Sequence, residues 1–542
     1  MNIKVQSKRM TLLCLFSLVN IFFIPEWANL FGEQSEQQIF LTPTPRLNAY
    51  FALGSTVFIL SLLLSVFLIQ IRRYQFKKIE TIFYLFIGAS LIVPINFLRE
   101  FAAIFSYYPQ LSYAAHGLLK YFVFPYKVII LILVAIAFIK VVRSQTTSLI
   151  KYVNALALLL APIIVVTYGN LFYKLYSAGH LVSLQNVISP SHMKNWDGPK
   201  VRWLIFDEMD YRLVFDDRPK GIKLPELDRL QKEAIFSSAA YPPNDYTIEA
   251  VPSLLSGARK SVITVKSEDL VLRNLITHAD EKWADISNIF RDVKDLGSTT
   301  ALVGWYHNYC PVFKTDLDYC RRLPMGRFGY DESFFGSVLV ILERAFILDK
   351  RLERAFIFNL EVITRRSLDK TISNNYGLSF FHFSVPHSPW IFDQIKGKTS
   401  PYILRSPEQY FGNMLLVDKI IGEFRRTLEA NGEWNKSTLI ISSDHSWRKS
   451  AEYDSKRDFR VPFIIKMADG KARVINKPIG TIVTKNFILE VMKKKISTTD
   501  EAVSWLQEQS KDFPKGTILI PFKDEETATS PSKKLDSKKA KG

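Results

Sequence analysis

The chain has 542 residues, enough for two or three ordinary domains, and carries a formal net charge of +18 at pH 7. Its mean hydropathy of +0.06 is high for a soluble protein. The positive charge lies largely in loops between apolar segments and in a Lys-rich C-terminal tail, which argues against nucleic-acid binding and favours contact with anionic lipid head groups.

The first 173 residues contain apolar segments that each approach the roughly 20 residues needed to span a bilayer. The five segments are 11–31, 47–70, 80–98, 117–139 and 149–172. A basic stretch precedes the first segment, as in a signal peptide, but no small-residue cleavage site follows, so we expect a retained helix. Buried helices of a large soluble domain are the alternative interpretation, and five such segments in series favour a transmembrane bundle over it.

Basic residues indicate the orientation of this bundle. They precede the first segment, fill the loop between the second and third, and flank the loop between the fourth and fifth. The loops 32–46 and 99–117 are poorer in Lys and Arg. By the positive-inside rule the N-terminus is cytoplasmic, and an odd number of spans places the rest of the chain outside. We therefore expect an integral protein of the plasma (inner) membrane with a large domain on the outer, periplasmic side.

The sequence after the transmembrane domain, 1–173, divides into three parts. Residues 174–200 form a turn-rich connector, 201–510 an outer domain, and 511–542 a charged tail that we expect to be disordered. In the outer domain short apolar strands alternate with amphipathic helices, which predicts an α/β domain with a mostly parallel central sheet covered by helices. The expected strands are 201–206, 299–305, 379–385, 437–442 and 461–466, and the expected helices include 224–236 and 408–432.

Acidic and imidazole side chains follow two of these strands. Asp207 and Glu208 follow the first, and Asp444 and His445 follow the strand 437–442. Sites in such sheets gather beyond the carboxyl ends of the strands, and carboxylates with one imidazole suit zinc, manganese or magnesium. Each pair alone is better explained as an acidic loop or a helix-capping Asp. Two such pairs at strand ends favour a metal site.

Two further segments carry candidate reactive groups. In 244–260, Thr247 begins a short helical segment that ends at Gly257, and a hydroxyl held there beside a metal can attack phosphorus. Spacing alone favours the simpler interpretation of Thr247 as a helix N-cap. His387 lies between Pro386 and Pro389, which suits a side chain that contacts an anion or protonates a leaving group, and an incidental surface histidine is the alternative.

The cysteines agree with an outer location. Cys14 lies in the first apolar segment, which leaves Cys310 and Cys320 as a pair in the outer domain. A non-cytoplasmic compartment permits a disulfide that closes this short loop. A zinc site is the weaker alternative, because His307 is the one nearby histidine and does not complete a ligand set.

The order Asp207, Thr247, His387 and Asp444-His445 resembles the alkaline phosphatase superfamily, and in particular its sulfatase-like branch. The resemblance covers roughly 200–470. Five spans before such a domain look like those of lipid A phosphoethanolamine transferases and lipoteichoic acid synthases. Sulfatases carry a Cys or Ser that is oxidised to formylglycine where this chain has Thr247, and threonine cannot undergo that conversion. The resemblance therefore implies transfer through a phosphothreonine.

This resemblance also implies site residues, a cofactor and partners. The metal would be zinc or manganese, with magnesium or calcium as alternatives. A phospholipid would donate a phosphoryl-linked head group to an envelope glycan or lipid. Rival hypotheses are a membrane-tethered hydrolase of phosphate or sulfate esters and a catalytically silent binding or signalling protein, which the complete ligand set disfavours. The implied metal ligands are Asp207, Glu208, Thr247, Asp444 and His445, the catalytic residues are Thr247 and His387, and His387 also binds the substrate. The phosphoethanolamine transferases have a further histidine after the metal motif, but none follows His445 within twenty residues here, so Arg448 and Lys449 are the substrate-binding candidates in its place.

Overall fold

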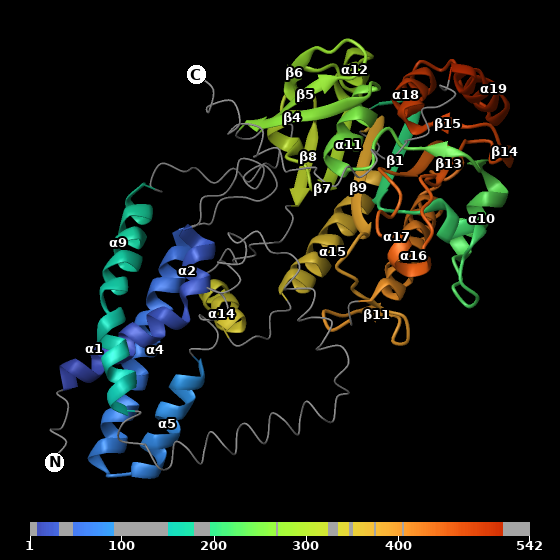
Figure 1. Cartoon of the computed structure of the whole chain (residues 1–542). Coiled ribbons are helices and arrows are strands. Elements are labelled where there is room, and N and C mark those ends of the chain that lie inside the picture. The colour runs from blue at the N-terminus through green and yellow to red at the C-terminus, as the bar shows by residue number, and fades with distance from the viewer. Residues whose placement is uncertain are drawn as a thin grey trace, which may run out of the picture. The chain divides into compact units, whose positions relative to one another are not determined.

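The protein is described here from a computed structural model. The structure describes residues 8–31, 47–90, 150–177, 196–266, 269–323, 334–345, 351–372, 376–403 and 406–512. Contacts between residues divide the chain into two compact units (Figure 1). Of the described residues, unit 1 contains 8–31, 47–90, 150–177 and 334–345, and unit 2 contains the others. Each is described by itself.

The described residues of unit 1 form helices. They are α1 (Lys8–Phe22), α2 (Ile24–Phe31), α4 (Leu47–Arg73), α5 (Lys77–Ser90), Ile150–Leu160, α9 (Pro162–Ser177) and α14 (Phe334–Ala345). Over the described ranges, α4 is the one helix that by itself is long and apolar enough to cross a membrane, and Ile150–Leu160 with Pro162–Tyr176 pass that test as a pair bent by 40°.

The described helices contain some of the predicted transmembrane segments in full and others only in part or not at all. Segment 47–70 lies within α4, and 11–31 is divided between α1 and α2. Residues 80–90 of the third segment lie in α5, whereas the fourth segment, 117–139, lies outside the described residues. The bundle of five helices stays a prediction.

Unit 2 is built on an eight-stranded sheet with the order β14-β2-β13-β12-β1-β9-β7-β8. The strands are β1 (Lys200–Asp207), β2 (Ile235–Ser237), β7 (Thr300–Trp305), β8 (Tyr319–Leu323), β9 (Leu378–Pro386), β12 (Ser437–Ser443), β13 (Phe463–Lys466) and β14 (Arg473–Ile475). The run from β12 to β8 is parallel throughout, and β13 is antiparallel to both of its neighbours. The expected α/β domain with a mostly parallel sheet is confirmed.

Helices cover both faces of this sheet (Figure 1). One face packs against α10 (Pro225–Glu233), α15 (Arg351–Thr371) and α16 (Tyr410–Ala430), and the other against α11 (Thr247–Ser256), α12 (Ile289–Asp295), α18 (Thr484–Met492) and α19 (Thr499–Gln509). Because side chains alternate along a strand, Trp203 and Ile205 of β1 face the α11 side, whereas Leu204 and Phe206 face the α16 side. The same alternation directs Asp207 to the α11 side.

Smaller elements surround this core. They are β3 (Ala240–Tyr241) with β15 (Ile479–Gly480), β10 (Phe392–Asp393) with β11 (Lys398–Thr399), the three-stranded sheet β4 (Lys260–Lys266), β5 (Asp269–Asn274) and β6 (Asp280–Lys282), and the short helices α13 (Tyr309–Val312) and α17 (Ser450–Asp454).

Two of the predicted elements have different limits in the structure. The helix expected over 224–236 ends at Glu233, because Ala234 is extended and residues 235–237 form β2 between β13 and β14. Burial of Ile235 and Phe236 in the sheet overrides the helical periodicity of the preceding residues. The strand expected over 461–466 begins at Phe463.

Candidate active site

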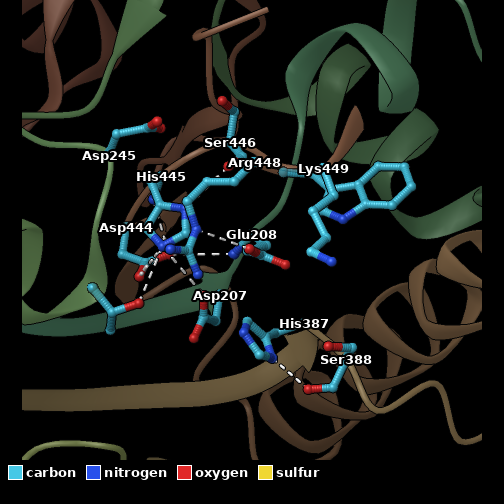
Figure 2. A network of polar contacts seen from close by, with 12 residues as sticks. Asp207, Glu208, Asp245, His387, Ser388, Asp444, His445, Ser446, Arg448 and Lys449 are labelled. Atoms are coloured by element: carbon cyan, nitrogen blue, oxygen red, sulfur yellow. Dashed lines mark hydrogen bonds and ion pairs between the residues drawn. The ribbon is translucent and has the colours of Figure 1, made fainter. Parts of the chain in front are cut away.

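The site lies at the carboxyl ends of the central strands. Strand β1 ends at Asp207, and its parallel neighbour β12 is followed at once by Asp444 and His445. Since Phe206 is paired with Ser443, Asp207 and Asp444 follow at adjacent positions of the sheet. Figure 2 shows Asp207, Asp444 and His445 gathered at this point. All three side chains are buried.

The next strand, β9, contributes a residue that sequence analysis did not single out. His382 is fully buried and is paired with Ile205 of β1, on the face that Asp207 shares. Its Nδ1 lies 2.7 Å from the Tyr309 hydroxyl. The sequence signal was weak, because a histidine inside an apolar strand is usually a core residue. Only the strand register relates His382 to Asp207.

Thr247 reaches the site from the element that covers this face. It is the first residue of α11, and its Oγ1 lies 3.1 Å from Nε2 of His445. Tyr246, which is extended, occupies the N-cap position, and its side chain makes no capping hydrogen bond. The N-cap interpretation of Thr247 is therefore wrong. His307 fixes this helix start, with its Nε2 3.0 Å from the Thr247 carbonyl oxygen, and burial lowers the pKa of His307 to about 3.

The tautomer of His445 follows from its surroundings. Its Nδ1 lies 3.0 Å from the carbonyl oxygen of Ser446, which can only accept, so Nδ1 carries the proton. Nε2 then presents a lone pair to Thr247, and it lies 3.6 Å from Oδ1 of Asp207 and 3.4 Å from Oδ2 of Asp444. A lone pair directed at two carboxylates favours a cation between them.

The oxygen and nitrogen atoms around this point are suited to bind such a cation. Among the described residues, both carboxylate oxygens of Asp207, Oδ2 of Asp444 and Nε2 of His382 are buried without a hydrogen bond. One donor atom from each of these residues lies within 4.8 Å of the others. Burial, and then the charge of Asp444, raises the pKa of Asp207 well above its ordinary value. Buried carboxylates of this kind are normally paired or coordinate a metal, so the residues fit a divalent ion.

Glu208 does not join this cluster. Its backbone has φ +67°, a left-handed conformation that is rare for a residue with a side chain. Its Oε1 accepts a hydrogen bond from Nε of Arg448 at 3.2 Å (Figure 2). Burial alone would raise the pKa of Glu208, but the nearby His387, His445 and Arg448 outweigh it, and the pKa is lowered. Asp207 and Glu208 thus have different surroundings although they are adjacent in sequence.

The strained turn after β1 is fixed by hydrogen bonds from residues that sequence analysis did not identify. The Tyr410 hydroxyl donates to the Glu208 carbonyl oxygen at 2.9 Å and accepts from the Asp210 amide at 3.0 Å. Ser443 Oγ accepts from the Met209 amide at 2.9 Å. Tyr410 is itself buried and stacked on Trp447 at 4.2 Å between ring centroids. These contacts hold both peptide groups that flank the turn.

His387 lies beside the same turn. Its backbone amide donates to the Asp207 carbonyl oxygen at 3.1 Å, and its Nδ1 contacts the Ser388 carbonyl oxygen (Figure 2). The flanking Val385-Pro386 and Ser388-Pro389 peptide bonds are cis. Asn413 of α16 donates to the carbonyl oxygens of Pro386, His387 and Pro389, so the loop has one defined path.

The two basic residues after His445 differ in position. Arg448 pairs with Glu208, and its guanidinium lies 5.0 Å from the centre of the Tyr246 ring, next to Thr247. Lys449 is largely exposed and forms an ion pair with Glu452 at 3.3 Å. The structure therefore brings Arg448, rather than Lys449, into direct contact with residues of the site.

Another basic residue, Arg457, connects the segment before Thr247 to the segment after His445. Its Nη2 donates to Oδ1 of Asp245 at 2.6 Å, and its Nη1 donates to Ser446 Oγ and the Trp447 carbonyl oxygen. It thus fixes the segment before Thr247 against the segment after His445. The predicted cysteine pair lies apart from these residues: Cys310 and Cys320 are joined by a disulfide with 5.6 Å between their Cα atoms.

Comparison with protein-family models gives one match: the model described as Sulfatase matches residues 209–493. The matched range contains Thr247, His387, Asp444 and His445, and Asp207 lies just before it. Comparison with curated proteins found no match.

Comparison with solved structures also gives matches of low identity, among them the following three. The phosphonate monoester hydrolase of Agrobacterium radiobacter is 12% identical over 54% of this chain and 74% of that chain, with a TM-score of 0.37. An alkaline phosphatase superfamily protein from Vibrio parahaemolyticus is 13% identical over 57% of this chain and 69% of that chain, with a TM-score of 0.37. PsFucS1 sulfatase from Pseudoalteromonas sp. is 14% identical over 54% and 67%, with a TM-score of 0.39.

Proposed function

The chain belongs to the sulfatase family, whose model matches more than half of its residues, and we propose that it is a membrane-anchored, metal-dependent phosphotransferase. It moves a phosphoryl-linked head group from a phospholipid donor to an envelope glycan or lipid, through a phosphothreonine on Thr247. This is the chemistry of the phosphoethanolamine transferases and lipoteichoic acid synthases that the sequence resembles.

One observation carries the proposal. A threonine hydroxyl, which cannot become formylglycine, lies 3.1 Å from His445 Nε2 beside two buried carboxylates, Asp207 and Asp444. A sulfatase needs the oxidised residue at this place, whereas a phosphotransferase needs a hydroxyl that can attack phosphorus.

Asp207, Asp444, His445 and Thr247 are the proposed ligands of the divalent ion, and His382 is a further donor. When bound, the ion favours the alkoxide form of the Thr247 hydroxyl and offsets charge on the phosphoryl oxygens. Glu208 is outside the set, because its carboxylate pairs with Arg448. That ion pair holds the Arg448 guanidinium over the ring of Tyr246, the residue before Thr247, and we assign it to bind a phosphoryl oxygen.

The reaction then has two balanced steps. Thr247 attacks phosphorus as the alkoxide through Oγ1, the bond from phosphorus to the diacylglycerol oxygen breaks, and that oxygen takes a proton from His387. In the second step the acceptor hydroxyl gives its proton to His387 and attacks phosphorus, and the bond to Thr247 breaks, which returns Thr247 as the alkoxide and His387 in its protonated form. The α11 N-terminus, which begins at Thr247, favours the anion in both steps.

Membrane attachment is part of the proposal. Helix α4 is long and apolar enough to span a bilayer, and the basic residues Arg72 and Arg73 at its end suit a cytoplasmic end. The catalytic domain is placed on the outer side, where lipid donors and envelope acceptors are available.

The test uses the purified full-length protein in detergent with phosphatidylethanolamine or phosphatidylglycerol, each carrying labelled head-group phosphate. We expect diacylglycerol release and label on Thr247, both abolished by chelator and by Thr247→Ala. Thr247→Ser keeps a hydroxyl at the same position and is the matched control, in which reduced but measurable release is expected.

Two results would contradict the proposal in different ways. Equal release by Thr247→Ala and the unchanged protein would exclude Thr247 as nucleophile. Failure to release diacylglycerol, together with Thr247-dependent cleavage of simple phosphate or sulfate esters, would make the protein a tethered hydrolase, the activity found among members of the superfamily.

A further inference from the structure

Helix α14 belongs to unit 1 although its sequence lies between two elements of unit 2. In the chain it follows β8 and precedes α15, both of which pack in the sheet domain. Yet α14 packs against α4 (Figure 1). Ile341 of α14 is fully buried in a cluster with Ala49, Leu53 and Val57 of α4. One helix whose sequence lies within that of unit 2 therefore packs in unit 1, the apolar N-terminal unit.

The exposed side of α14 carries large apolar side chains, unlike that of a helix of a soluble domain. Its inner side includes Ser337 and Ile341, both with no exposed surface. Its outer side presents Phe335 and Leu339, which are 78% and 64% exposed and lie four residues apart, on one stripe of the helix. A soluble helix hides its large apolar side chains and exposes its polar ones. Here two large apolar side chains face outward although Ile341 packs inward.

The partner helix α4 likewise has an apolar exposed side. Ser61 and Ser65 are buried, and their hydroxyls donate to the carbonyl oxygens one turn earlier. Phe58, Ile59 and Leu63 are each more than half exposed. Small and polar residues at helix contacts with large apolar residues outside are typical of helices in lipid. The outward stripe of α14 thus has the same chemistry as the exposed side of α4.

The position and length of α14 define how it meets the bilayer. It packs on the half of α4 that contains Ala49 to Val57, opposite the end that carries Arg72 and Arg73. Its 12 residues give a helix of about 18 Å, too short for a hydrocarbon core of about 30 Å. Both flanking sequences belong to unit 2, so the chain must enter and leave on the same side.

We propose that α14 is a lipid-contacting helix whose Phe335 and Leu339 side chains insert among acyl chains of the outer leaflet. The catalytic domain is then attached to the membrane twice, through the connector after α9 and through α14. This inference rests on the proposed membrane anchoring of unit 1 and extends it to a segment within the catalytic sequence.

The test measures the surroundings of single spin labels in full-length protein reconstituted into phosphatidylethanolamine and phosphatidylglycerol vesicles. In a Cys14→Ser background, which leaves no other free thiol, labels are attached at Phe335→Cys and Leu339→Cys. Ile59→Cys, on the exposed side of α4, reports on anchoring, and Ile395→Cys, at a residue of unit 2 that is 98% exposed, is the water reference. Collision rates with oxygen, which enriches in lipid, and with a water-soluble nickel chelate are compared.

We expect the labels at 335 and 339 to behave like the label at 59, with high oxygen and low nickel collision rates. If they behave like the label at 395 while position 59 stays in lipid, the inference about α14 is wrong and the anchoring stands. If position 59 is also open to nickel, the anchoring itself fails. Protection of 335 and 339 from both reagents would mean that protein covers α14, either a second copy or unit 2, and would overturn the inference.

Discussion

Replacing Tyr410 with Phe removes one oxygen atom and tests whether the turn after β1 is held for function. The hydroxyl bonds two backbone groups, the Glu208 carbonyl oxygen and the Asp210 amide. The ring would keep its stack on Trp447. The change therefore isolates the two hydrogen bonds from the packing of the side chain.

The magnitude follows from burial. Tyr410, Glu208 and Asp210 are each less than 5% exposed, so the carbonyl and amide left behind have little access to water. An unsatisfied buried group costs about 1–3 kcal/mol, and the two together should lower the free energy of unfolding of unit 2 by about 2 kcal/mol or more. Glu208 is also held at positive φ, and release of that conformation would shift the adjacent Asp207. By analogy with other supports of metal ligands, metal affinity should fall by about 10- to 100-fold.

The assay combines thermal unfolding with a metal titration by calorimetry, on full-length protein in detergent. For a domain of roughly 300 residues, 2 kcal/mol corresponds to a decrease in Tm of about 3 °C. Tyr376→Phe is the matched control, because this buried tyrosine precedes β9, at the end of the strand away from the site. If Tyr410→Phe and Tyr376→Phe bind metal as tightly as the unchanged protein, the turn does not position Asp207 and the argument fails.

Asp444→Asn should lower the metal bound per molecule by removing a charged ligand, measured by elemental analysis of the purified protein, and an unchanged metal content would exclude Asp444 from the ligand set. Burial raises the pKa of Asp210 to about 7, against about 3.9 when unfolded. Its protonated form is favoured in the fold, so its contribution is fully present below about pH 4 and is lost as the pH rises to about 7, by up to roughly 4 kcal/mol. Asp210→Asn should therefore remove part of the decline in Tm between pH 5 and 8 in chelator, and identical Tm profiles of mutant and unchanged protein would refute this assignment.

The sequence predicted the framework of unit 2 because its signals are local. Apolar runs marked β1, β7, β9 and β12 within a residue or two at each end, and the polar residues that follow β1 and β12 could be recognised from chain order alone. The parallel sheet followed from alternation of strands with helices. Helix 224–236 shows the limit, since Ile235 and Phe236 fit a helical pattern but are drawn into the sheet.

The sequence by itself determined which chemistry is available: Thr247 in place of an oxidisable cysteine, and the acidic and imidazole residues at strand ends. Only the tertiary structure decided how these groups are used. His382 comes to Asp207 because two strands far apart in sequence share a register, and Glu208 turns to Arg448 because its backbone has positive φ. The packing of α14 on α4 could not be predicted from the sequence either. The sequence of an apolar helix does not show whether it packs on the sheet of its own domain or on a helix nearly three hundred residues earlier in the chain. Contacts between distant segments depend on shape and register, which no local pattern contains.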